Sequence, residues 1–238
     1  MKLLFESSFE RLSQQEQGAF VSLSVFVGDS FDEHAAVQVI DGKNIIAKRI
    51  LRGIKRKSLL DSSGTEAKPL FFHPLIRSFA IEKAQHEIKE IALEARTRFL
   101  GNYVSLFKDL NQEFLAGNSL SSFRNFELEK ENILYSLGGE VTSCETVDEA
   151  FFHVLPTSDL FIDTIVYFEG AHLFNTIYDS AITKAIQQDN VVATHKLLLG
   201  RAFGVITSGS MRFLKMAEEI EKGNPLLIPN TAKGKNLQ

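Results

Sequence analysis

Hydrophobic residues in the first sixty positions recur at helical spacing, in short blocks that begin with capping signals. Ser13-Gln-Gln-Glu16 has the spacing of a capping box, and the apolar run AFVSL follows it, so a helix is predicted to begin there. Ser30-Phe-Asp-Glu33 repeats this spacing and predicts a short helix over roughly residues 31–40. A third helix is predicted over 43–57, where aliphatic positions recur every three or four residues.

Short apolar segments after these helices predict a β-hairpin. Ser58–Asp61 and Pro69–Phe72 are the strand candidates, and they flank Ser62-Ser-Gly-Thr65, whose glycine suits a turn. Pro74 fits the first position of a following helix, where its missing N–H costs nothing. Three helices, a hairpin and another helix are the outline of a winged helix, which we predict for residues 1–87.

The rest of the chain is helical almost throughout. The stripe that opens it, with spacings of three and four, consists of Ile88, Ile91, Ala92, Ala95, Phe99 and Leu100. Further helices are predicted from Ser122, from the capping box Thr146-Val-Asp-Glu149, and near 159–169, 171–188, 191–207 and 210–222. The fold class is therefore mainly α, with an α-helical bundle or a degenerate tetratricopeptide-like solenoid over 88–222. Residues 223–238 are predicted to form a flexible tail.

Aromatic residues gather in the later helices, and they fit two interpretations. Exposed aromatics form grooves that bind peptides, whereas buried aromatics form the core of a bundle. The residues concerned are Phe151, Phe152, Phe161, Tyr167, Phe168, Phe174 and Tyr178.

Composition narrows the class of protein. Of 238 residues, 44% are hydrophobic, which is enough for a substantial core. The net charge of −4 argues against nucleic acid as a partner bound through overall charge. The single cysteine, Cys144, fits a reducing compartment. Glu6 and Glu10 interrupt the N-terminal apolar residues, so these residues are not expected to form a signal peptide. No apolar run reaches membrane-spanning length. We expect a cytoplasmic protein without membrane contact.

The helix predicted over 43–57 separates apolar from basic residues. Its apolar arc contains Ile46, Ala47, Ile50, Leu51 and Ile54, and its basic interaction face contains Lys48, Arg49, Arg52, Lys55 and Arg56. One interpretation is a nucleic-acid-binding winged helix whose third helix contacts phosphates. The other is a solvated face, or one docked on an acidic neighbour. Residues 139–195 carry nine acids and one base, so the helices of 140–189 are an internal candidate for that neighbour.

Motifs for catalysis are absent from the sequence. The six histidines are scattered without H-E-x-x-H spacing, and neither G-x-S-x-G nor G-x-G-x-x-G occurs. Cys144 lies beside acidic residues, which raise a thiol pKa rather than activate the thiol. We therefore expect no enzyme and no metal site.

His73 lies between Phe72 and Pro74, where a strand is predicted to pass into a helix. It fits two interpretations. One is a core histidine with a satisfied hydrogen bond. The other is a polar group at or near the helix N-cap, where the positive end of the helix dipole can receive an anion such as phosphate.

Several segments, in this order and spacing, resemble one family. They are FERLS at 9–13, QGAFVSLSVFVG at 17–28, FDEHAAV at 31–37, KSLL at 57–60, FFHPLIRSFA at 71–80, ARTRFLGNY at 95–103 and EKENIL at 129–134. The resemblance is to the winged-helix part of NB-ARC proteins and the entry into their tetratricopeptide-like repeats. These proteins belong to the STAND class of signal-transduction ATPases.

The resemblance implies a regulatory role in signalling, as in innate immunity or apoptosis. The winged helix would dock on a nucleotide-binding domain in cis or in trans, and the helical region would bind a protein partner. His73 matches the histidine that touches the phosphates of bound ADP, although Phe72 and Pro74 stand where the family has methionine and aspartate. No G-x-x-x-x-G-K-[ST] occurs, so this chain alone is expected to bind no cofactor, and ADP or ATP would be bound only in a full-length context.

Overall fold

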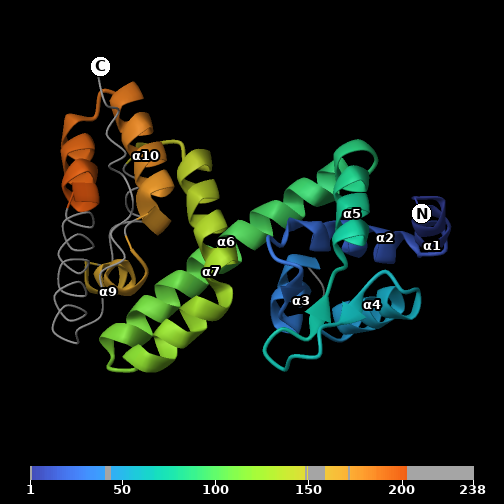
Figure 1. The fold of residues 1–238 in the computed structure, drawn as a ribbon. Coiled ribbons are helices and arrows are strands. Elements are labelled where there is room, and N and C mark those ends of the chain that lie inside the picture. The colour runs from blue at the N-terminus through green and yellow to red at the C-terminus, as the bar shows by residue number, and fades with distance from the viewer. Residues whose placement is uncertain (1, 41–43, 148, 150–158, 171, 203–238) are drawn as a thin grey trace, which may run out of the picture.

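The computed structural model describes residues 2–40, 44–147, 149, 159–170 and 172–202. The fold is mainly helical, with one small antiparallel sheet, as the sequence predicts. Figure 1 shows two parts, with α1–α5 and the sheet at one end and α9 and α10 at the other, joined by the long helices α6 and α7. The predicted helix at 210–222 and the tail at 223–238 lie outside the described residues.

The N-terminal part follows the predicted order of elements. It contains α1 (Lys2–Glu10), α2 (Gln14–Ser22), the 3-10 turn η1 (Leu23–Val25), α3 (Glu33–Ile40), α4 (Asn44–Arg56) and α5 (Pro74–His86). The capping box before α2 is confirmed, because Ser13 Oγ accepts from Glu16 N and Glu16 Oε2 accepts from Ser13 N. Helix α1 was not expected from the pattern.

The second predicted capping box was assigned to the wrong residues. Ser30 lies in a strand, and Asp32 caps α3 instead, since its Oδ2 accepts from Ala35 N at 2.9 Å. Aspartate is as good an N-cap as serine, and its carboxylate also suits the positive end of the helix. The helix therefore begins at Glu33 rather than at residue 31.

The sheet has three strands in the order β1-β3-β2, all antiparallel. Its strands are β1 (Ser30–Phe31), β2 (Asp61–Ser62) and β3 (Leu70–Phe71). The predicted hairpin is present as β2–β3, with Asp61 opposite Phe71, and Gly64 takes a positive φ of 77° in its turn. Its first strand was predicted over 58–61 but is formed by Asp61–Ser62, three residues later than expected. Strand β1 adds an unpredicted third member, paired with β3 through Ser30 and Phe71.

Aromatic rings hold the N-terminal part together. Phe20 packs edge-on against Phe72, and Phe26 stacks on Phe31 with centroids 4.2 Å apart. Phe26 also meets Phe99 of α6 edge-on at 5.4 Å. Rings of this size bury the most apolar area per residue, so this chain of contacts ties the sheet and η1 to α6.

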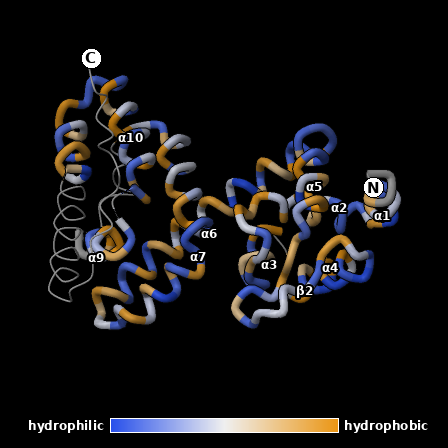
Figure 2. The backbone as a smooth tube through the Cα atoms, viewed as in Figure 1, coloured by the Kyte–Doolittle hydropathy of each residue, from blue (hydrophilic) through white to orange (hydrophobic). Residues whose placement is uncertain are grey.

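The remaining described elements form a helical arm. They are α6 (Lys89–Leu115), α7 (Ser119–Ser143), α9 (Asp159–Glu169), α10 (His172–Gln187) and a further helical segment over 191–202. Along α6 and α7, hydrophobic and hydrophilic residues alternate at short intervals, as the two faces of an amphipathic helix require (Figure 2). Phe161 of α9 packs against Phe107 and Phe126, so α6, α7 and α9 share one core.

Helix α6 serves both parts. It follows α5 almost directly, near the predicted border at residue 87. Its first half packs on the N-terminal part through side chains such as Phe99, and the Arg98 side chain donates from Nε to Val39 O at 2.8 Å. Its second half packs on α7 and α9. Among the described residues, no helix has both the length and the apolarity that crossing a membrane requires.

Candidate functional site

His73 is exposed and caps α5. Its Nδ1 accepts a hydrogen bond from Leu75 N at 3.2 Å, and Pro74 begins the helix. The interpretation of His73 as a core histidine is therefore wrong, because its side chain is exposed. The predicted position at the helix N-cap is confirmed. Because Nδ1 accepts, the proton of the neutral ring is on Nε2, which makes Nε2 a hydrogen-bond donor.

Neighbouring residues fix His73 in place. Phe72 is fully buried against Phe20 and Phe31, and it anchors the residue before the cap. Arg77 lies near the start of the same helix, and its Nε and Nη2 donate to Phe26 O at 3.1 and 2.5 Å rather than to His73. Arg77 thus ties α5 to the end of η1 instead.

The first turn of α5 offers fewer donors than a typical helix end. Pro74 has no N–H, Leu75 donates to the His73 ring, and Arg77 N donates to His73 O at 2.9 Å. Any anion at this end would therefore be bound mainly by the imidazole Nε2–H and the helix dipole.

The basic face predicted for residues 43–57 lies on α4. Arg49, Arg52 and Arg56 are exposed, whereas Lys48 pairs with Glu33 at 3.2 Å and Lys55 donates to Ser62 Oγ at 2.9 Å. An open hollow of about 420 Å³ is lined by Arg49, Arg52, Lys55 and Arg56. The structure thus brings four of the five predicted residues together, and Lys48 lies at the border.

The opposite side of α4 is anchored in the core. Ala47, Leu51 and Ile54 are buried, as the wheel predicts, but Ile46 on the same arc is 40% exposed. At the C-terminal end, Lys57 Nζ bonds Glu16 Oε2 at 2.9 Å and Arg11 O at 2.7 Å. These contacts hold α4 against α2 and fix the direction of its basic face.

In the part of the chain that the structure describes, the acidic helices do not cover this face. Helix α4 packs on α2 and α3, and Figure 1 places it at the opposite end of the molecule from α9 and α10. Acids of that region have other partners, since Glu169 pairs with Lys130 at 3.0 Å and Asp179 with Arg201 at 2.8 Å. The internal-neighbour interpretation is therefore not supported.

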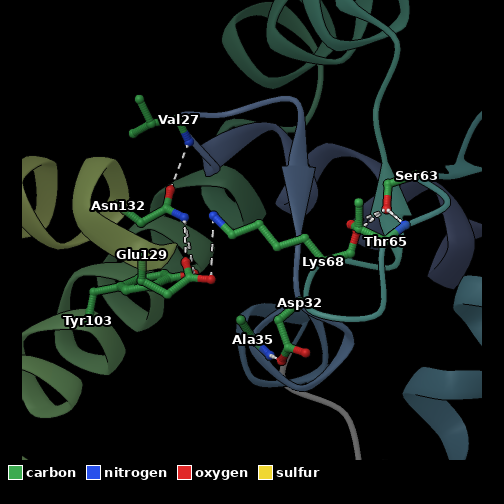
Figure 3. Close-up of polar contacts among 9 residues, drawn as sticks. All are labelled: Val27, Asp32, Ala35, Ser63, Thr65, Lys68, Tyr103, Glu129 and Asn132. Atoms are coloured by element: carbon green, nitrogen blue, oxygen red, sulfur yellow. Dashed lines mark hydrogen bonds and ion pairs between the residues drawn. The ribbon is translucent and has the colours of Figure 1, made fainter. Parts of the chain in front are cut away.

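A polar cluster that the sequence did not reveal joins the two parts (Figure 3). Asn132 Oδ1 accepts from Val27 N at 3.1 Å, while its Nδ2 donates to Glu129 Oε2 and to Tyr103 OH. Tyr103 OH also donates to Glu129 Oε2 at 3.0 Å, and Lys68 Nζ lies 3.5 Å from Glu129 Oε1. Burial, with the nearby Glu129 carboxylate, raises the pKa of Tyr103 well above its ordinary range.

Beside this cluster lies a cavity of about 430 Å³ between α3, α6 and α7. Its lining includes the acids Asp32, Asp109 and Glu129 and the imidazole of His34. Among the described residues, no group of three or more side chains is placed to hold a metal ion.

The aromatic residues of the later helices divide between core and surface. Phe161 and Phe174 are buried, which supports the core interpretation for these two, whereas Tyr167 and Phe168 are 41% and 59% exposed. Tyr178 is half-buried, and Phe151 and Phe152 lie outside the described residues.

Cys144 is half-buried at the C-terminal end of α7. Burial raises its thiol pKa, and Glu140 adds to the shift, as expected from its acidic neighbours. The thiol is therefore not activated.

Compared with models of protein families, with curated proteins and with solved structures, this chain gives no match.

Proposed function

We propose that this chain is a non-catalytic regulatory and protein-interaction segment of a STAND-type (NB-ARC) cytoplasmic signalling protein. It would couple the ADP state of a nucleotide-binding domain, supplied in cis or in trans, to the binding of a protein partner by the helical arm. The observation that carries the proposal is the exposed His73 at the N-cap of α5, with its Nε2–H available for a phosphate oxygen.

The element order supports a winged-helix assignment for the N-terminal part. Helices α2, α3 and α4 precede the hairpin β2–β3, and α5 follows it. Strand β1 completes a three-stranded sheet, so the hairpin is anchored to the start of α3. In this arrangement the end of β3 and the start of α5 present His73 at the surface, where a separate domain can reach it.

The connection between α5 and α6 supports the coupling. Lys83, near the end of α5, is buried and pairs with Glu87 at 2.7 Å and with Glu6 of α1 at 2.5 Å. Only two residues, Glu87 and Ile88, separate α5 from α6. A displacement of α5 caused by a phosphate at its N-terminus would therefore be passed directly to α6.

The test uses the protein from cells that naturally express it. The tagged chain is purified with its bound partners, the intact mass is measured, and nucleotide released by acid is quantified by chromatography. A hydrogen bond to a charged group such as phosphate contributes about 1.5–3 kcal/mol net, so His73→Ala is expected to lower retained ADP about 13- to 160-fold. A nucleotide-binding domain should be found in the same chain or in a co-purifying one.

His86→Ala is the matched control, because His86 is also exposed and lies at the other end of α5. It should leave ADP retention unchanged. Equal ADP in wild-type and His73→Ala samples, or purification without any nucleotide-binding domain, would refute the proposal.

A further inference from the structure

We propose that the basic face of α4, formed by Arg49, Arg52, Lys55 and Arg56, binds the phosphate backbone of double-stranded DNA. This inference goes beyond the proposed function and does not depend on it, since it uses α4 rather than the N-terminus of α5. It rests on the position, direction and composition of this face.

The cations of the face are available. Among the described residues no carboxylate pairs with Arg49, Arg52 or Arg56. Glu33 pairs with Lys48 at the border of the face, and Glu16 pairs with Lys57 at the end of the helix. Lys55 donates to the Ser62 hydroxyl, and no carboxylate in the described part of the chain pairs with it. Four unneutralised cations so close together raise each other's energy, and a polyanion would relieve that repulsion.

The geometry suits a duplex. Arg49 to Arg56 spans eight residues, so the two ends lie about 10 Å apart along the α-helix, and the major groove of B-DNA is about 12 Å wide. Helices α3 and α4 contact each other and are separated by three residues, Asp41 to Lys43, as in helix-turn-helix proteins. In those proteins the second helix lies in the major groove, and α4 is the second helix of this pair.

The composition of the face favours double-stranded DNA over a protein, a membrane or double-stranded RNA as its partner. A protein interface needs aromatic or aliphatic anchors at its centre, and the stretch from Arg49 to Arg56 exposes none. A membrane would require the apolar side of α4, but Ala47, Leu51 and Ile54 are buried in the core. Double-stranded RNA has a major groove too narrow for a helix.

Arginine suits phosphate, because its planar guanidinium bonds two oxygens at once. Between Arg49 and Arg56 there is no asparagine or glutamine to read adenine. Binding should therefore depend on the backbone and only weakly on base sequence.

The experiment is fluorescence anisotropy of the full chain with a labelled 20-base-pair duplex at 50 and 200 mM salt. Contacts with three or four phosphates give a salt slope near −3, so the dissociation constant should rise about 40- to 150-fold between the two salts. Arg49→Glu with Arg52→Glu should abolish binding, and Arg49→Gln with Arg52→Gln should weaken it and flatten the salt dependence.

The charge-matched control is Arg96→Glu with Arg124→Glu, because both residues are exposed on the helical arm and the change in net charge is the same. This variant should bind the duplex almost as wild type does. Circular dichroism should show that every variant is folded, since Arg49 and Arg52 are exposed.

Three results would overturn the proposal. They are no duplex binding at 50 mM salt, an equal loss of binding in the control variant, and binding of a labelled glutamate-rich peptide, sensitive to Arg49 and Arg52, in place of the duplex. The last would identify the face as a docking site for an acidic protein.

Discussion

At the scale of single residues, Tyr103 and Asn132 show how the two parts are joined. Tyr103 is 3% exposed and Asn132 is 2% exposed, so their polar atoms have left water and depend on each other and on Glu129. A buried polar network of this kind is stabilising only while every member has its partner. Tyr103 and Asn132 are 29 positions apart in the sequence. Val27, whose backbone N–H donates to Asn132, is 105 positions from it.

Stability should fall at alkaline pH because of Tyr103. Its pKa is raised in the folded protein, so above pH 10 the unfolded chain releases a proton that the folded chain keeps, and unfolding becomes more favourable. The free energy of unfolding should be unaffected by this group below pH 10 and should fall above it by up to about 1.4 kcal/mol per pH unit. Urea unfolding at several pH values measures this slope.

Absorbance at 295 nm separates Tyr103 from the other three tyrosines. The difference between wild type and Tyr103→Phe isolates the Tyr103 signal, which should appear only as the protein unfolds. Tyr103→Phe should reduce the alkaline slope. Reversible ionisation of Tyr103 near pH 10 without unfolding would contradict the burial of its hydroxyl.

At the scale of elements, the junction of α2 and α4 depends on a missing side chain. Glu16 accepts from Ser13 N and from Lys57, and Gly53 of α4 faces it so closely that an added Cβ would overlap Glu16 Oε1. Burial opposes ionisation of Glu16, but these hydrogen bonds outweigh it and lower its pKa. A glycine inside α4 is therefore required for packing, although glycine disfavours helices.

Gly53→Ala should destabilise the protein by about 1–2 kcal/mol, because it displaces the carboxylate that caps α2 and pairs with Lys57. Gly101→Ala is the matched control, since a Cβ at Gly101 of α6 meets nothing within 4 Å. It should stabilise by up to about 1 kcal/mol through helix propensity. Thermal unfolding compares the two, and stabilisation by both would show that Glu16 moves away without cost.

Local patterns predicted the elements better than their contacts. The amphipathic spacing of α4 predicted its buried side, because burial of Ala47, Leu51 and Ile54 follows directly from helical periodicity. Strand β1 was missed because two residues give no alternation, and Ser30 and Glu33 imitated a capping box. Helix α7 begins at Ser119, before the predicted Ser122. The earlier start was missed because Asn118 makes no side-chain cap that a capping pattern would show.

The candidate sites were predictable to different degrees. The N-cap position of His73 could be predicted because Pro74 marks the start of a helix. The basic face could be predicted because apolar and basic residues recur at helical spacing along α4. The direction of Arg77 toward Phe26 and the cluster around Asn132 depend on residues distant in sequence. No local spacing of residue types encodes such contacts.

At the scale of the whole molecule, the described parts should unfold together. Helix α6 contributes to both cores, and Arg98–Val39, Asn132–Val27 and Lys68–Glu129 cross between the N-terminal part and the arm. We expect one transition in differential scanning calorimetry, coincident with that seen by circular dichroism. Two separated transitions would contradict this.

Asn132→Ala tests the same coupling. It leaves Val27 N–H without its acceptor and should cost about 1–3 kcal/mol, lowering the single transition as a whole rather than splitting it. Asn125→Ala, at an exposed position of the same helix, should change stability by less than about 0.5 kcal/mol. Equal effects of the two substitutions would show that the buried amide contributes nothing specific.

The length of α6 has a mechanical consequence. Its 27 residues form an unbroken rod of about 40 Å, which contacts the N-terminal part near one end and α7 and α9 toward the other. A tilt of about 5° at the first of these ends would sweep the far end through roughly 3.5 Å, about the width of one atomic contact. The rod would thus work as a lever, turning a displacement too small to break any bond into a gain or loss of contacts at its tip.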